Sequence, residues 1–353
     1  MNSEKIYKNL RKFMDSLPAG FPETESGVEI KILKKLFTPE QAKLFMKLTF
    51  EPETVENIAN RIGIEPAILN LKLEEMAVQG LLFRDHQDNQ VRYQNFHFIV
   101  GIYEFQLNTI DKELAEMIEE YLPHLGMALA VAGVKTKQLR VAPVSSAIDT
   151  ASPVANYNMI RELIKNQELI SVTNCICRKE QGLLDNNCGY PHETCFAFGK
   201  FAHYYIDNKM GRKIDVSEAM EILDLAEESG LVLSPSNTKE ICFVCCCCPC
   251  CCPTIRYAKF FPKPVKMFKT YYQSYIDPET CTSCHECFDR CPMEAIIEGK
   301  ETSEIHKDRC IGCGLCVSIC PENAISLQAI QDVEDPPEFL EDVFKQIMEE
   351  RQL

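Results

Sequence analysis

Two runs of cysteine near the C-terminus hold the strongest chemical signal in the sequence. The first follows the spacing Cys-x2-Cys-x2-Cys-x3-Cys-Pro over 281–292, and the second repeats it over 310–321. Both runs continue as Pro-x-x-Ala-Ile, so the second is a copy of the first about 29 residues later. Thiolates at this spacing bind 4Fe–4S clusters, which transfer single electrons. We therefore expect two such clusters at this end of the chain.

A second concentration of cysteines lies upstream, between residues 175 and 252. Eight of its twelve cysteines fall within the eleven positions 242–252. Adjacent residues of a helix or strand point in different directions, so these eight cannot all bind one cluster. The sequence therefore predicts one or more further 4Fe–4S clusters, with a partition that spacing does not reveal. The candidate ligands are Cys175, Cys177, Cys188, Cys195, Cys242, Cys245, Cys246, Cys248, Cys250 and Cys251.

Two other interpretations of these upstream cysteines stay open. Structural zinc is one, with His192 or His203 as an added ligand. Structural or redox-active thiols without metal are the other. Arg178 and Lys179, beside the first cysteine pair, would neutralise a cluster anion, bind an acidic group, or form a solvated basic turn.

The composition limits the classes of protein to consider. A chain of 353 residues with 46% apolar and 25% charged residues is typical of a globular protein with two to four domains. The net charge of −15 disfavours a general nucleic-acid or membrane-surface binder. We expect no membrane span and, without a signal-peptide core, a cytoplasmic location where thiols stay reduced and bind metal. Clusters of this kind are oxygen-sensitive, which indicates an anaerobe.

The elements that must position these cysteines predict a multidomain α+β protein. We expect a helical arm and winged-helix region over 1–126, a cysteine-rich α/β central domain over 127–255 and a basic linker over 256–274. A two-cluster domain then covers 275–330, and an acidic helical tail covers 331–353.

Residues 38–95 carry the pattern of a winged helix-turn-helix. One helix opens at Pro52 and Thr54 and the next at Pro66. A two-stranded wing with a polar tip at 85–89 follows, and a long helix is expected over 99–125. The helix that would read DNA is nearly neutral or acidic, since its polar residues are Asn70, Lys72, Glu74 and Glu75. This favours a docking or scaffolding module over a DNA reader.

The central region is expected to mix strands and helices. Strands are predicted over 139–144 and 169–172, and helices over 156–166, 193–208 and 216–229, in either an α+β or a small α/β order. The second strand delivers the chain to Cys175 and Cys177, at the end of a strand where ligands commonly bind. Cys188 then lies on a loop, and Cys195 lies at the start of a helix.

Residues 275–330 closely resemble a two-cluster bacterial ferredoxin. The resemblance implies a sandwich of two short hairpins and two helices, with the fourth cysteine of each run crossing to the other cluster. The implied ligands are Cys281, Cys284, Cys287 and Cys320 for the first cluster, and Cys310, Cys313, Cys316 and Cys291 for the second. Ser283 and His285 replace the Gly312 and Gly314 of the second run, so we expect the two clusters to differ in potential, with His285 tuning the first.

The whole chain resembles a family of 4Fe–4S-binding proteins of strict anaerobes, both bacterial and archaeal. The similarity rests on the opening SLPAGFPETESGVEIKILKKLF, the strand end CICRKEQGLL, the run CCCCPCCC and the two-cluster region. It implies iron–sulfur electron transfer in an anaerobic cytoplasm and no particular substrate.

The sequence thus predicts an electron-transfer protein that serves a partner oxidoreductase. It has neither a dinucleotide-binding G-x-G-x-x-G motif nor a phosphate loop, so a nucleotide site would belong to another subunit. One alternative is an oxidoreductase with a catalytic iron–sulfur site in the central domain. Another is a redox-responsive winged-helix regulator, although nucleic acid is an unlikely partner. Helices over 99–125 and 338–350 are candidates for pairing two chains in a homodimer.

Overall fold

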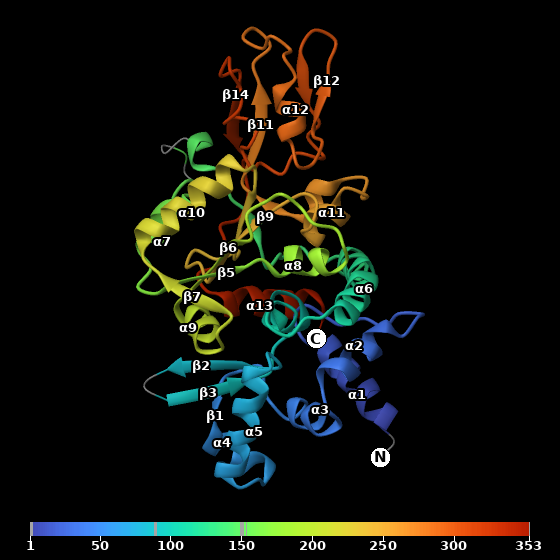
Figure 1. Ribbon diagram of the computed structural model, residues 1–353. Coiled ribbons are helices and arrows are strands. Elements are labelled where there is room, and N and C mark those ends of the chain that lie inside the picture. Colours follow the sequence, from blue (N-terminus) through green and yellow to red (C-terminus); the bar gives the residue numbers. More distant parts are fainter. Residues whose placement is uncertain (1–2, 88–89, 149–151, 153, 353) are drawn as a thin grey trace.

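The computed structural model describes residues 3–87, 90–148, 152 and 154–352. Figure 1 shows three parts stacked along one axis. The N-terminal helices lie at one end, a sheet with its helices lies in the middle, and the C-terminal module, residues 272–329, lies at the other end. The mixture of helices and antiparallel sheets is α+β.

The N-terminal part consists of short helices and a three-stranded sheet in the order β1-β3-β2. Thr38 begins one helix with a capping box, and Gly63, in the left-handed conformation, ends another. The tip predicted at 85–89 extends over 88–89, outside the described residues, and the winged-helix assignment stays a prediction. The elements are α1 (Ser3–Asp15), α2 (Val28–Leu36), α3 (Pro39–Phe45), β1 (Glu53–Thr54), α4 (Val55–Ile62), α5 (Pro66–Val78), β2 (Phe83–Gln87) and β3 (Gln90–Gln94).

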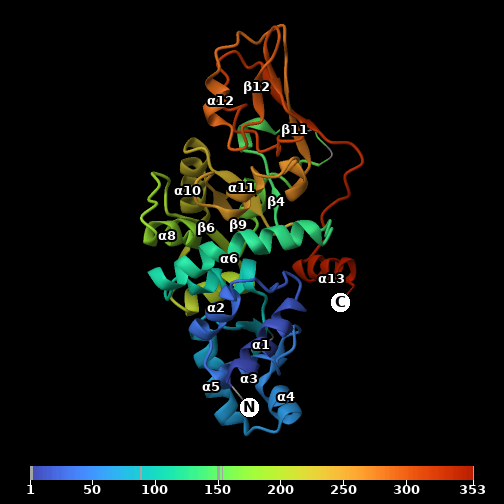
Figure 2. The same cartoon turned by 90° about the vertical axis from the view of Figure 1, so that its right-hand side faces the viewer.

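The long helix expected over 99–125 is wrong in its bounds. An irregular turn, η1 (Phe98–Ile102), and a short 3₁₀ helix, η2 (Glu104–Gln106), come first, and α6 covers Lys112–Val131. Val100 takes a positive φ of 53°, which interrupts any helix, and Asp111 begins α6 by accepting a hydrogen bond from the Leu114 backbone N–H at 2.9 Å. Helix α6 continues through the domain boundary predicted at residue 126, between the N-terminal and central parts (Figure 2).

The central part is built on a five-stranded sheet in the order β7-β5-β6-β9-β8. Every neighbouring pair is antiparallel, so the order is α+β and not a parallel α/β layer. The strands are β5 (Ile170–Asn174), β6 (Glu193–Phe198), β7 (Gly211–Ile214), β8 (Val232–Pro235) and β9 (Phe243–Cys247). The helices are α7 (Ile160–Lys165), α8 (Ile176–Leu183), α9 (Gly199–Asp207), α10 (Val216–Glu228) and α11 (Pro253–Ala258).

Two predictions in this part are corrected. Residues 193–198 form strand β6 and not the first half of a helix, because Thr194, Phe196 and Phe198 suit a strand between two neighbours. Cys195 therefore lies on a strand and not at a helix start. The strand expected over 139–144 is reduced to β4 (Arg140–Val141).

The C-terminal module pairs β11 (Tyr272–Ile276) with β14 (Ile325–Ala329), and β12 (Ile296–Glu298) with β13 (Ser303–Ile305). Helix α12 (Glu286–Arg290) lies within the first cysteine run, and the corresponding residues 315–319 of the second run form turns and not a second helix.

The predicted basic linker over 256–274 is largely structured. It contains the end of α11, the 3₁₀ helix η4 (Pro264–Met267) and β10 (Lys269–Thr270), which pairs with β4 in parallel. Lys259 and Lys263 form ion pairs with Glu294 and Asp308, so basic charge in this segment meets acidic charge of the module.

The tail helix α13 (Leu340–Glu350) packs back onto the N-terminal part (Figure 1). The Phe344 ring lies 5.3 Å from Phe50 and 4.8 Å from His97, between ring centroids. Arg84 of β2 donates a hydrogen bond to Asn208, after α9, at 3.2 Å. No helix of the described residues has the length and apolar character that a membrane span requires.

Candidate iron–sulfur and metal sites

The first four cysteines expected to share a cluster lie around one small cavity of 330 Å³ in the C-terminal module. We call Cys281, Cys284, Cys287 and Cys320 the first quartet. The Ala324 backbone N–H donates a hydrogen bond to Cys320 Sγ at 3.3 Å, a contact that stabilises negative charge on sulfur. The Cys284 side chain is exposed, so this quartet opens to solvent at one edge.

The other four lie around a matching cavity of 320 Å³. We call Cys291, Cys310, Cys313 and Cys316 the second quartet. The backbone N–H groups of Ala295 and Ser274 donate hydrogen bonds to Cys291 Sγ at 3.2 Å and to Cys310 Sγ at 3.4 Å. Burial raises the pKa of Cys316 to about 12, so a positive centre is needed before this thiol can serve as a thiolate ligand.

Both runs turn through the same backbone conformation with different residues. Gly312 and Gly314 have φ of 69° and 73°, and Ser283 and His285, at the corresponding positions of the first run, have φ of 55° and 66°. Only glycine adopts this region without strain. His285 also lines the cavity of the first quartet.

The second quartet lies against the central part, whereas the first is surrounded by its own module. Cys310 and Cys313 share a hydrophobic cluster with Val141, Val232 and Cys252. The Val144 backbone N–H donates a hydrogen bond to the Cys313 carbonyl at 3.0 Å. The cluster around the first quartet contains Ile276, Ile296 and Ile325, all from the module.

Strand β9 divides the upstream cysteines between its two faces. Side chains alternate along a strand, so Cys245 and Cys247 face one way and Cys246 and Cys248 face the other. The first face carries Cys195 as well, because it pairs directly with Cys245 across β6 and β9. Cys246 and Cys248 belong instead to the core beneath α7 and α10.

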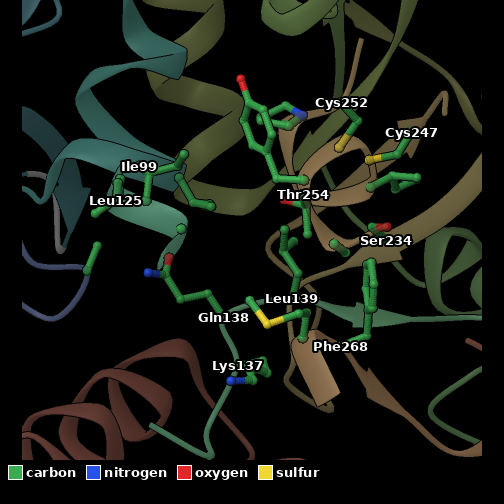
Figure 3. A pocket seen from close by; sticks show the side chains of 18 of the residues that line it. Ile99, Leu125, Lys137, Gln138, Leu139, Ser234, Cys247, Cys252, Thr254 and Phe268 are labelled. Atoms are coloured by element: carbon green, nitrogen blue, oxygen red, sulfur yellow. The ribbon is translucent and has the colours of Figure 1, made fainter. Parts of the chain in front are cut away.

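Eight cysteines border a cavity on the first face of the sheet, and two of them, Cys246 and Cys248, alternate toward the other face. We call the remaining six, Cys175, Cys177, Cys195, Cys245, Cys247 and Cys252, the central sextet. Hydrogen bonds from the Cys177 and Cys195 thiols hold the pKa of the Cys175 thiol well below its usual value. Cys247 and Cys252 also border an adjoining cavity, where their sulfur atoms face one another (Figure 3).

Four further cysteines form a tighter group at the end of β9. We call Cys188, Cys248, Cys250 and Cys251 the compact quartet. Their sulfur atoms all lie within 4.8 Å of one another, and Cys250 Sγ and Cys251 Sγ are 3.7 Å apart. Cys188 comes from the loop between α8 and β6, and the other three come from the turn after β9.

Arg178 is not part of a solvated turn, because its side chain is only 1% exposed. It donates hydrogen bonds to Thr194 Oγ1 at 2.8 Å and to the Cys246 carbonyl at 2.6 Å. Burial alone would lower its pKa, but the thiolates of Cys175, Cys248 and Cys195 raise it. One buried guanidinium therefore serves both the central sextet and the compact quartet. Lys179 is tied by a hydrogen bond to the Leu107 carbonyl.

Two of the ten upstream candidates join neither group. Cys242 Sγ lies 3.9 Å from the Glu240 carbonyl, and Cys246 packs in the core. Cys247 and Cys252 border the central cavity but are not among the ligands predicted from the sequence. The sequence holds no local signal for Cys247, because four consecutive cysteines over 245–248 show no polar and apolar alternation. His192 and His203 belong to neither group: the His192 carbonyl accepts a hydrogen bond from the Cys175 N–H, and the His203 ring lies 6.1 Å from His86.

Comparisons with known proteins match the C-terminal module. Residues 273–321 match the family described as 4Fe-4S dicluster domain. A ferredoxin of Rickettsia felis is 37% identical over 73 residues, 19% of this chain and 67% of that protein. The pyruvate synthase subunit PorD of Thermotoga maritima is 43% identical over 51 residues, 14% of this chain and 52% of that protein.

A third relative belongs to an ion-translocating oxidoreductase complex of Methanosarcina acetivorans, as one of its subunits. It is 42% identical over 48 residues, 14% of this chain and 18% of that protein. The chain thus spans at most about two thirds of the length of these relatives, and they match one fifth of it or less.

Proposed function

Because the chain belongs, through residues 273–321, to the family of ferredoxin-type 4Fe–4S dicluster domains, we propose that it is an electron-transfer protein that passes electrons to or from a partner oxidoreductase in anaerobic metabolism. The observation that carries this proposal is the gathering of two cysteine quartets, each drawn from both runs, around two small cavities. Relatives that are subunits of oxidoreductases favour a partner enzyme over a free carrier.

The arrangement supports a direction of travel through the molecule. The first quartet, with its exposed Cys284, would exchange electrons with the partner. The second quartet would pass them on, since it shares a hydrophobic cluster with Cys252. The central sextet would hold at least one further cluster, for which its six thiols offer more than four ligands. Arg178 would offset part of the negative charge there.

Anaerobic iron and sulfide analysis of the full-length protein tests this proposal. About eight irons per chain is the expectation for the module alone, and about twelve or more includes the central sextet. Electron paramagnetic resonance of the reduced protein should resolve interacting clusters of the module. Protein prepared without oxygen that contains no iron would overturn the proposal.

The two adjoining cavities favour one second candidate, an oxidoreductase whose central cluster is catalytic. They share part of their lining, which includes Cys247 and Cys252. An iron with an open coordination position would bind cyanide or carbon monoxide and change its resonance signal. A central signal that neither ligand changes would favour the carrier.

The N-terminal part is better suited to docking than to reading DNA. Helix α5 exposes the apolar side chains of Ile68, Leu71 and Val78 at the positions where a DNA reader needs polar groups. Arg84 of β2 is bound to Glu74 and Asp207, so it is not free for a phosphate. DNA binding that weakens steeply with salt would contradict this assignment.

A further inference from the structure

The compact quartet, Cys188, Cys248, Cys250 and Cys251, calls for a different occupant from the other cysteine groups. We propose that it binds a single metal ion shared by four thiolates, and not a 4Fe–4S cluster. The chemistry is that of a thiophilic ion in a tetrahedral all-sulfur site, and zinc is the metal expected. This inference does not depend on the electron-transfer function.

The distances between the sulfur atoms carry the argument. A tetrahedral ion with metal–sulfur bonds of about 2.3 Å holds its four sulfurs about 3.8 Å from one another. Cys250 Sγ and Cys251 Sγ are 3.7 Å apart, and all four sulfurs lie within 4.8 Å of one another. The remaining distances need only a small contraction to close around one ion.

A 4Fe–4S cluster requires wider spacing, because each thiolate binds its own iron atom. The first and second quartets provide the comparison within the same molecule. Among the described residues, neither of them contains three sulfurs that all lie within 4.8 Å of one another. The compact quartet is therefore too tight for the cluster that the other two quartets suit.

The local fold explains why these four sulfurs meet. Cys248 leaves β9 on the face away from the central sextet, and a turn stabilised by the Cys252 N–H and the Cys248 carbonyl, 3.3 Å apart, brings Cys250 and Cys251 back beside it. Cys188 reaches the same point from the loop that joins α8 to β6. A bound ion would tie this loop to the end of the central strand.

The ligand set selects the metal. Four thiolates without histidine or carboxylate match structural zinc sites, and zinc binds such donors more tightly than ferrous iron does. A divalent ion with four thiolates carries a net charge of −2. The buried Arg178 side chain, which hydrogen-bonds to Cys248, offsets part of that charge.

Metal analysis of the full-length protein tests the proposal. The protein is purified anaerobically from cells supplied with iron and zinc. We expect about one zinc per chain in the wild type, and an at least about fivefold loss in both Cys188→Ser and Cys250→Ser. Iron and sulfide should not change in either variant. Cys242→Ser, a partly buried cysteine outside all four groups, is the matched control and should keep its zinc.

The outcomes are distinct. X-ray absorption should find four sulfur neighbours at about 2.3 Å from zinc. The loss of one iron in place of zinc would support the single-ion site with iron as its metal. The loss of about four irons with matching sulfide would overturn the proposal, as would wild-type protein whose only metal is cluster iron that both variants keep. Because Cys250 is exposed, serine there tests the site even if Cys188→Ser fails to fold.

Discussion

The first cysteine run places side chains where the second run has glycine. Ser283 and His285 have φ of 55° and 66°, and such left-handed backbone costs an ordinary residue about 1 kcal/mol or more. We attribute this strained backbone to the tight turn that places Cys284 and Cys287 beside the cavity of the first quartet. His285 lies against the Phe288 ring, with centroids 4.6 Å apart, and lines the same cavity. It is the residue best placed to distinguish the first cluster from the second.

We therefore predict that His285→Gly brings the two potentials together. The variant removes a polar ring beside the first cluster and gives that run the glycine of the second run. Redox titration followed by electron paramagnetic resonance should resolve two steps in the wild type and one merged step in the variant. Unchanged potentials would contradict this role. The stability of the folded protein should rise by about 1 kcal/mol, because glycine adopts the positive φ without strain.

Gly314 is required for the module to approach the central part. A Cβ atom there would lie 2.6 Å from the Ala147 Cβ, closer than two carbons can pack, and φ is 73°. We predict that Gly314→Ala lowers the free energy of unfolding by about 2–3 kcal/mol in urea titrations. Gly133→Ala is the control, because it has φ of 70° and open space around its Cβ position. Equal losses in the two variants would mean that the contact with Ala147 contributes nothing.

His97 makes folding depend on pH in the acidic range. Burial lowers its pKa to about 3, against an ordinary value of 6.5. The unfolded chain therefore binds a proton that the folded protein excludes, so stability is lost as pH falls from about 6.5 toward 3. Protonation of His97 in the unfolded chain should lower the free energy of unfolding by about 2 kcal/mol between pH 7 and pH 5.

The comparison of two proteins isolates this effect. Urea unfolding at pH 7, 6 and 5 should give a shallower loss of stability for His97→Gln, which cannot titrate but can still donate a hydrogen bond to the Val100 carbonyl. Loss of clusters in acid affects both proteins and cancels in the difference. If the free energies of unfolding of the two proteins fall in parallel with pH, His97 is not the cause of the acid loss of stability.

At the scale of elements, strand β9 separates the proposed cluster site from the proposed zinc site by the alternation of its side chains. We predict that Cys245→Ser or Cys247→Ser lowers iron bound in the central part by about one cluster, because both side chains face the central sextet. Cys246→Ser should leave all metal in place and cost about 1–3 kcal/mol of stability, because it puts a hydroxyl into the core. Iron, sulfide and zinc analysis of the three variants checks this pattern. Loss of iron in Cys246→Ser would contradict it.

The sequence predicts the cysteine groups whose members lie close together in the chain, and it does not predict the groups that depend on contacts between distant segments. The spacing of the two C-terminal runs is local, and their cysteines gather around two cavities in the expected combinations. The upstream groups depend on pairing between distant strands, such as Cys195 with Cys245, which spacing does not encode. A run of cysteines also has no polar and apolar alternation, so it hides the period of β9. Strand β6 shows the same limit. Helix α9 follows it directly, so the sequence pattern does not show where the strand ends and the helix begins.

At the scale of the whole molecule, the ends of the chain hold its parts together. Helix α13 contributes Leu340, Val343 and Phe344 to the core of the N-terminal part. Arg351 donates hydrogen bonds to the carbonyls of Leu17 and Pro18. The chain therefore crosses from the module back to its beginning, as Figure 2 shows, and helix α6 runs beneath the central part.

Within the proposed function, the stacking of the parts favours one order of electron transfer, from the first quartet through the second to the central sextet. We predict that a protein without the first cluster, made as Cys284→Ala, loses the rapid phase in which a reduced viologen reduces the central cluster. The second quartet shares a hydrophobic cluster with the central part, and its four cysteines are less exposed than Cys284. Stopped-flow spectroscopy with freeze-quenched resonance samples measures the order in which signals appear. If the central signal rises at an unchanged rate, electrons enter the central part directly, and the large cavities beside Cys247 and Cys252 become the point of entry.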